Sequence, residues 1–245
     1  MSRARRSWSR RWVYAVVVIV LPLAIVVVWL RSGPSGPAVV VYGDSLTVQS
    51  KHAAHRLPGD PANRIVFRAE AGTALCDWLK KAAKDSRGLK PQRVVLALTG
   101  NTATCARASF DKGGAAATVA LYEQSLRQMR AIFPTVPITI VIPPAMHDQV
   151  GWYPLNGDPR LVAMYKRVGP ELHMYVNTDA DTWLTPGHVY EQYRPDFVTG
   201  KLVDVRLTDG VHLSPAGARW YGAALAERQS GDFVRSEVKS RSAAG

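Results

Sequence analysis

Short runs of β-branched and other apolar residues recur along the chain from residue 38 onward. They cover Val39–Tyr42, Ile65–Phe67, Val94–Leu98, Ile138–Ile142 and Met174–Val176. Each run is apolar at consecutive positions rather than at alternate ones, which is typical of strands buried on both faces of a parallel sheet.

Segments of helical periodicity separate several of these runs. Ala115–Phe133 repeats apolar residues every three or four positions, and Pro159–Leu172 and Ser214–Arg228 read as further helices. The last of these opens with Ser-Pro, a capping residue followed by a first-turn proline. Strands that alternate with helices predict an α/β fold, a three-layer α/β/α sandwich around a mostly parallel sheet. Ligands in such sheets bind beyond the carboxyl ends of the strands.

The N-terminal region has a different pattern, because residues 12–30 carry no charge. A helix of this length spans about 28 Å, roughly the hydrocarbon thickness of a bilayer. Five arginines precede it in residues 1–11, and Arg31 closes it. We therefore predict a cytoplasmic basic tail (1–11), one transmembrane anchor (12–30), a Gly/Pro/Ser linker (31–37), an extracytoplasmic domain (38–228) and a disordered tail (229–245).

A cleaved signal peptide is the alternative for the same segment, and it would make the protein secreted. The apolar run is longer than the 7–15 residues usual for a signal peptide, and the linker has no clear Ala-x-Ala cleavage site. Both interpretations export the domain.

Composition narrows the class of protein. Apolar residues make up 47% of the 245 residues, which excludes a disordered chain, and two cysteines are too few for a disulfide-stapled mini-protein. The formal net charge is +12, but residues 1–31 hold six arginines and no acidic residue, which leaves +6 for the rest. The basic cluster is predicted to lie at the membrane, so nucleic acid is not expected as a partner.

The first strand runs directly into Gly43-Asp44-Ser45-Leu46. A serine at the end of a strand and the start of a helix is well placed as a nucleophile, with its hydroxyl at the positive end of the helix. The alternative is an ordinary turn in which Asp44 or Ser45 caps the helix.

A second motif, Asp209-Gly210-Val211-His212, precedes the last predicted helix. A hydroxyl needs an imidazole to take its proton, and that imidazole needs an acceptor on its other nitrogen. Asp209 and His212 can meet across a tight turn that contains glycine. The alternative is an Asx turn with His212 as an ordinary surface residue.

Together the two motifs resemble the GDSL-type, or SGNH, hydrolases. The resemblance covers residues 38–228, and it implies that Ser45 is the nucleophile, His212 the general base and Asp209 its orienting acid. It also implies a hydrolase that uses no cofactor, and no Cys/His cluster at metal-ligand spacing is present in the sequence.

The same resemblance implies an oxyanion hole made by the backbone of Ser45, the backbone of Gly72 and the amide of Asn101. Gly72 follows the second predicted strand, and Asn101 follows the third. The third block departs from the family pattern, because Thr99 stands in place of a glycine and Thr102 in place of an aspartate. We expect a divergent subgroup.

Cys76 and Cys105 each follow an oxyanion residue by four positions. In an exported domain with no other cysteine, we expect them to form a disulfide that ties the two oxyanion loops together. Two buried free thiols are the alternative.

The sequence thus predicts a membrane-tethered bacterial serine esterase that cleaves acyl groups from an envelope glycan or lipid. Two alternatives stay open: an acyltransferase that passes the acyl group to a sugar hydroxyl, and a non-catalytic glycan- or lipid-binding module. His147, Trp152 and Tyr153 are candidates to line the substrate site, and Trp183 and His188 are candidates for a lid. The oligomeric state stays open.

Overall fold

Five parallel strands form the central sheet of the computed structural model, which describes residues 38–56, 64–147 and 155–226. The strands are β1 (Ala38–Gly43), β2 (Arg64–Ala69), β3 (Arg93–Ala97), β4 (Ile138–Val141) and β5 (Tyr175–Asn177). Their ends differ from the predicted runs by at most two residues. The order β2-β1-β3-β4-β5 reverses direction between β1 and β3, the point at which such sheets place their ligands.

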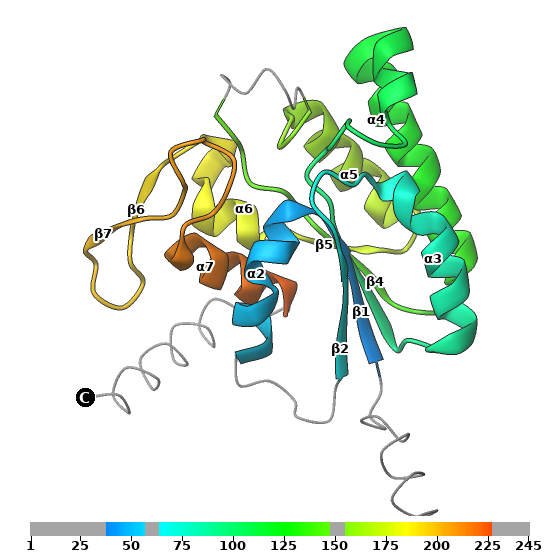
Figure 1. Cartoon of the computed structure of the whole chain (residues 1–245), viewed down its shortest axis with the longest axis horizontal. Coiled ribbons are helices and arrows are strands. Elements are labelled where there is room, and N and C mark those ends of the chain that lie inside the picture. Colours follow the sequence, from blue (N-terminus) through cyan, green and yellow to red (C-terminus); the bar gives the residue numbers. More distant parts are fainter. Residues whose placement is uncertain (1–37, 57–63, 148–154, 227–245) are drawn as a thin grey trace, which may run out of the picture. The chain divides into compact units, whose positions relative to one another are not determined.

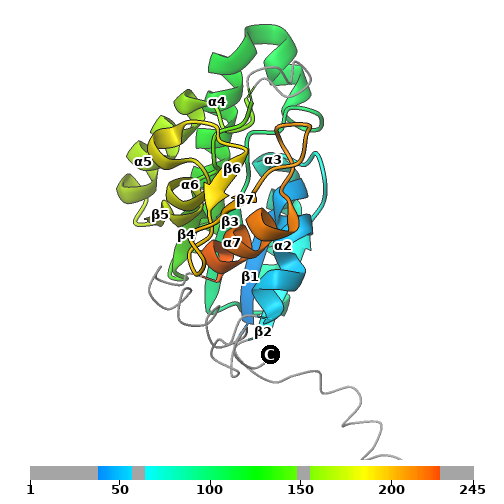
Figure 2. The ribbon, with the colours of Figure 1, turned by 90° about the vertical axis from the view of Figure 1, so that its left-hand side faces the viewer.

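Helices cover both faces of this sheet, which confirms the predicted three layers (Figure 1). One face carries α3 (Leu75–Gly88), α4 (Arg107–Ile132) and α5 (Pro159–Glu171). The other carries α2 (Ser45–Arg56), α6 (Asp179–Leu184) and α7 (Pro215–Leu225). Figure 2 shows α2 and α7 side by side in front of the sheet.

Two hydrophobic cores follow from the alternation of side chains along each strand. Val40 and Val94 belong to the core beneath α3, α4 and α5, whereas the next residues, Val41 and Val95, belong to the core beneath α2, α6 and α7. Successive side chains of a strand point to opposite faces of the sheet, so a strand apolar at every position fills both cores.

Some elements differ from the prediction. The helix expected to begin at Ala115 begins at Arg107, and Gly113 and Gly114 interrupt it with non-helical backbone angles. This break explains why the apolar periodicity is visible only after residue 114. The antiparallel pair β6 (Tyr193–Pro195) and β7 (Leu202–Asp204), the helix α6 and the short 3₁₀ turn η1 (Pro186–His188) were not predicted.

The predicted basic tail, anchor, linker and C-terminal tail lie outside the described residues. Within the described ranges, no helix has both the length and the apolar character to cross a membrane.

Candidate active site

Ser45 is the first residue of α2 and is partly buried, directly beyond the carboxyl end of β1. The preceding residue, Asp44, accepts a hydrogen bond from the backbone N–H of Leu46 at 3.2 Å. The capping role considered for this motif therefore falls to Asp44. The first N–H groups of a helix have no partner within the helix, so the backbone at Ser45 can serve an anion.

Asp209 and His212 form a close pair in the turn before α7. Asp209 Oδ2 lies 2.6 Å from His212 Nδ1, and Asp209 Oδ1 accepts the backbone N–H groups of Val211 and His212 at 2.9 and 2.8 Å. Gly210 has φ of +72°, and a Cβ there would lie 2.5 Å from His147 Cβ, so the turn requires glycine.

Asp209 orients the His212 imidazole, because its carboxylate accepts a hydrogen bond from Nδ1. Burial opposes the charged form of Asp209, but hydrogen bonds from the His212 side chain and backbone outweigh it and lower the pKa of this carboxyl. A carboxylate at Nδ1 leaves Nε2 as the acceptor, the form that a general base needs. The His212 side chain is 36% exposed, so Nε2 is accessible.

A hydrogen bond links the helix that begins at Ser45 to the residue that follows the Asp209–His212 turn. Gln49 Oε1, one turn along α2 from Ser45, accepts the backbone N–H of Leu213 at 3.1 Å, across 164 residues of sequence. Ser45 and His212 make no direct hydrogen bond in the described residues. Catalytic hydrogen bonds often tighten only when the substrate is bound.

The buried carboxylate of Asp44 holds Thr99 and Asn101, which belong to the third block of the family pattern. Its Oδ2 accepts the backbone N–H and the hydroxyl of Thr99 at 2.7 and 2.6 Å and the side-chain amide of Asn101 at 3.1 Å. Burial raises the pKa of the Asp44 carboxyl, and the hydrogen bonds from Thr99 partly oppose this rise. Thr99, which departs from the family pattern, thus has a defined structural role: its hydroxyl stabilises a buried acid.

Asn101 is 2% exposed and is fixed at three points. Its amide nitrogen donates to Asp44, its backbone carbonyl accepts the Tyr122 hydroxyl at 3.0 Å, and its Oδ1 accepts from the Asn156 amide at 3.5 Å. The preceding residue, Gly100, has φ of +113°, and a Cβ there would lie 2.2 Å from the carbonyl oxygen of Leu155.

Gly72 lies in the turn after β2 and is partly buried, with φ of +79°. The next residue, Thr73, donates a hydrogen bond from its hydroxyl to the carbonyl of Gly43 at 3.3 Å. This contact brings the turn to the end of β1, which is the edge where Ser45 begins α2.

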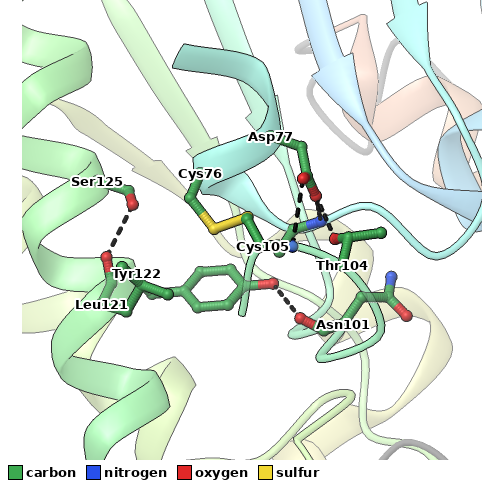
Figure 3. The surroundings of a disulfide bond; sticks show 9 residues. Cys76, Asp77, Asn101, Thr104, Cys105, Leu121, Tyr122 and Ser125 are labelled. Atoms are coloured by element: carbon green, nitrogen blue, oxygen red, sulfur yellow. Dashed lines mark hydrogen bonds between the residues drawn. A yellow bond between two sulfur atoms is a disulfide. The ribbon is translucent and has the colours of Figure 1, made fainter. Parts of the chain in front are cut away.

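The predicted disulfide joins Cys76 to Cys105 (Figure 3). Asp77 adds a polar link beside it, because its carboxylate accepts hydrogen bonds from the Thr104 hydroxyl and from the backbone N–H of Cys105. The N-terminus of α3 is therefore tied to the loop after β3 both covalently and by hydrogen bonds.

A pocket of about 410 Å³ adjoins these motifs. Its lining consists of Ala145, Met146, His147, Gly157, Pro159, His188, Val189 and Tyr190. The backbone N–H of His147 donates to the carbonyl of Gly210 at 3.1 Å, which puts the pocket beside the Asp209–His212 turn. Trp152 and Tyr153 lie outside the described residues. Within the described residues, no cluster of three or more potential metal ligands occurs.

The two residues considered for a lid, Trp183 and His188, lie in different surroundings. Trp183, a candidate lid residue, is instead 5% exposed and packs against Phe197 in the core. His188 bonds to Asp181, seven residues away, and to the carbonyl of Gly157, 31 residues away, and the second contact leaves no local signal in the sequence.

The comparisons with known proteins agree with this arrangement at the level of the fold. A lipase/acylhydrolase from Enterococcus faecalis matches at 22% identity with a TM-score of 0.54, covering 78% of this chain and 94% of its own. An acetylxylan esterase from Geobacillus stearothermophilus matches at 16% identity with a TM-score of 0.54, covering 81% of this chain and 94% of its own. The domain has the SGNH/GDSL-hydrolase fold.

A GDSL-like lipase from Bacteroides thetaiotaomicron matches at 15% identity with a TM-score of 0.52, over 78% of this chain and 86% of its own. No protein-family model and no curated protein matches this sequence.

Proposed function

We propose that this protein is a membrane-tethered, extracytoplasmic serine esterase that hydrolyses ester-linked acyl groups. The proposal rests chiefly on one observation: an Asp209–His212 pair, joined at 2.6 Å, is held beside the helix that begins with Ser45 by the Gln49–Leu213 hydrogen bond. Ser45 lies near one end of the domain sequence and Asp209 and His212 near the other, and this hydrogen bond between Gln49 and Leu213 supports their assignment to one site.

The chemistry would proceed through an acyl-enzyme. His212 Nε2 takes the proton of the Ser45 hydroxyl as Oγ bonds to the ester carbonyl carbon. The C–O bond to the alcohol then breaks, and the alcohol leaves with the proton from His212. A water molecule repeats the two steps and releases the acid and free Ser45.

The oxyanion would be stabilised by three donors, which are the backbone N–H groups of Ser45 and Gly72 and the amide of Asn101. An amide nitrogen carries two hydrogens, and Asn101 gives one to Asp44, so the other is available to the substrate. Asn101 is almost fully buried, and a desolvated donor stabilises a developing charge more strongly than an exposed one.

The substrate would be an acylated envelope glycan or lipid. The lipase/acylhydrolase and acetylxylan esterase that share the fold support an acyl ester as the bond cleaved. The apolar segment 12–30 and its preceding arginines support a membrane tether, with the domain outside the cytoplasm.

The test uses the full-length chain in detergent. We expect it to hydrolyse a nitrophenyl acetate ester and to be labelled by a fluorophosphonate at Ser45, located by peptide mass spectrometry. Ser45→Ala and His212→Ala should each lower kcat by about 10³-fold or more, because members of such a triad act as a unit. Asn101→Ala should lower it by about 10²–10³-fold.

Two matched variants control for the loss of a serine or a histidine. Ser86→Ala removes a hydroxyl that bonds only within α3, and His52→Ala removes an exposed ring on α2. Both should keep the rate and the labelling. Hydrolysis that survives Ser45→Ala, or a label on another serine, would contradict the proposal. Acyl transfer to added sugar, beyond its molar ratio to water, would replace hydrolysis by transfer as the activity.

A further inference from the structure

His188 is held between two hydrogen-bond acceptors. Its Nδ1 lies 2.8 Å from Asp181 Oδ1, and its Nε2 lies 2.7 Å from the carbonyl oxygen of Gly157. A neutral imidazole carries one N–H and can satisfy only one of these acceptors. The geometry therefore requires the doubly protonated, charged ring.

The surroundings of the ring stabilise that charge. Asp181 Oδ1 also accepts the hydroxyl of Thr185 at 2.8 Å, as a carboxylate does, and the Asp181 side chain is 9% exposed. The hydrogen bond from Asp181 raises the pKa of His188, while burial and the charge of Lys166 lower it by less.

Titratable or charged side chains reach this region from each neighbouring element. They are Lys166 on α5, Asp181 on α6, His147 and Tyr190 in the pocket lining, and the buried Arg206 after β7. Asp181 is the acidic side chain bonded to the ring, Lys166 acts electrostatically on His188, and Arg206 acts electrostatically on Asp181.

Gly157 connects His188 to residues 99–101, which include the proposed oxyanion donor Asn101. Its backbone N–H donates to the carbonyl of Thr99 at 2.8 Å, while its own carbonyl accepts from His188. The neighbouring Asn156 amide donates to Asn101 Oδ1 at 3.5 Å. The segment 155–158 is thus bonded to His188 on one side and to residues 99–101 on the other.

We propose that protonated His188 is a positioning residue that holds segment 155–158 against residues 99–101 and so fixes the Asn101 amide for the oxyanion. When the ring loses a proton, one nitrogen presents a lone pair to an acceptor, and the segment is released. The kinetic consequence rests on the proposed esterase function, whereas the protonation state does not.

The direction of the pH effect follows from the raised pKa. A histidine whose pKa is higher in the folded state contributes fully below its unfolded pKa of about 6.5, and this contribution is lost as the pH rises through the folded value. His188 would therefore supply an alkaline limb to the kcat profile.

The kinetic experiment compares the full-length chain with His188→Asn and His188→Arg. The position has φ of +60°, which asparagine tolerates, but the shorter side chain cannot reach both partners. Arginine carries a charge and several donors that do not titrate. We expect about a tenfold lower kcat, a similar KM and no alkaline limb in His188→Asn, since loosening a donor costs less than the 10²–10³ of removing it. His188→Arg should recover most of the rate at high pH.

The second experiment does not depend on activity. Nitrogen NMR of the full-length chain with isotopically labelled histidine should show His188 protonated at both nitrogens at neutral pH, with its signal assigned by its loss in His188→Asn. A neutral ring there would overturn the proposal, as would an alkaline limb unchanged in His188→Asn. A doubly protonated ring in a chain without esterase activity would instead refute the proposed function alone.

Discussion

Thr99→Val tests whether the buried carboxylate of Asp44 holds the segment 99–102 in place. The substitution keeps the shape of the side chain and removes a hydroxyl that donates to Asp44 Oδ2 at 2.6 Å. Thr99 and Asp44 are 1% and 0% exposed, so water cannot replace the lost donor. A hydrogen bond to a charged group contributes about 1.5–3 kcal/mol.

We therefore expect the free energy of unfolding to fall by about 1.5–3 kcal/mol, and Tm by about 3–12 °C for a domain of this size. Burial already raises the pKa of Asp44, and an acid with a raised pKa costs stability above that pKa. The loss should thus be largest above the raised pKa of Asp44 and should shrink as the pH falls through it. Thermal unfolding followed by circular dichroism across this range measures it.

Thr118→Val is the matched control for this prediction. Thr118 is as buried as Thr99, but its hydroxyl donates to the neutral carbonyl of Gly114 at 3.0 Å, a bond that contributes about 0.5–1.5 kcal/mol. Thr99→Ser keeps the hydroxyl and should preserve most of the stability. A loss in Thr99→Val no larger than in Thr118→Val, or one independent of pH, would refute the assignment of Thr99 as a partner of ionised Asp44.

Three further predictions concern the rest of the site. Replacing Cys76 and Cys105 together by serine removes a crosslink between residues 29 apart and should lower the free energy of unfolding by about 3–4 kcal/mol. Thermal unfolding measures this loss, and an equal Tm in the oxidised wild type and the variant would contradict it. Gly100→Ala, at φ of +113° beside a backbone carbonyl, should lower ester hydrolysis by about 10²-fold through displacement of the oxyanion donor, whereas Gly88→Ala, which meets open space, should leave the rate intact. Asp209→Asn should be less stable than wild type at neutral pH. Because hydrogen bonds lower the pKa of Asp209 below its ordinary value of 3.8, this difference should disappear as the pH falls through the lowered value. A difference in the free energy of unfolding that persists in acid would contradict this shift.

Much of the scaffold could be predicted from the sequence because its signals are local. Runs of apolar residues such as Val94–Leu98 located the five parallel strands to within two residues. The central strands β1, β3 and β4 are largely buried, as such runs predict, whereas the edge strands β2 and β5 are partly exposed. The Asp209–His212 contact lies within one tight turn, so spacing alone predicted the pair. The disulfide followed from the presence of only two cysteines in the chain. The catalytic roles of Ser45, Asp209 and His212 stay predictions that the variants above can test.

The contacts between segments far apart in the chain were decided only by the tertiary structure. Residue patterns do not encode the contact of Gln49 with Leu213, the donation of the Thr99 hydroxyl to Asp44, or the ring of His188 between Asp181 and Gly157. The sequence by itself determined which residues form strands, helices and tight turns, because those depend on neighbours within a few positions. Only the tertiary structure decided which buried donors meet which acceptors, because each such pair depends on strand order and on helix packing across the whole domain.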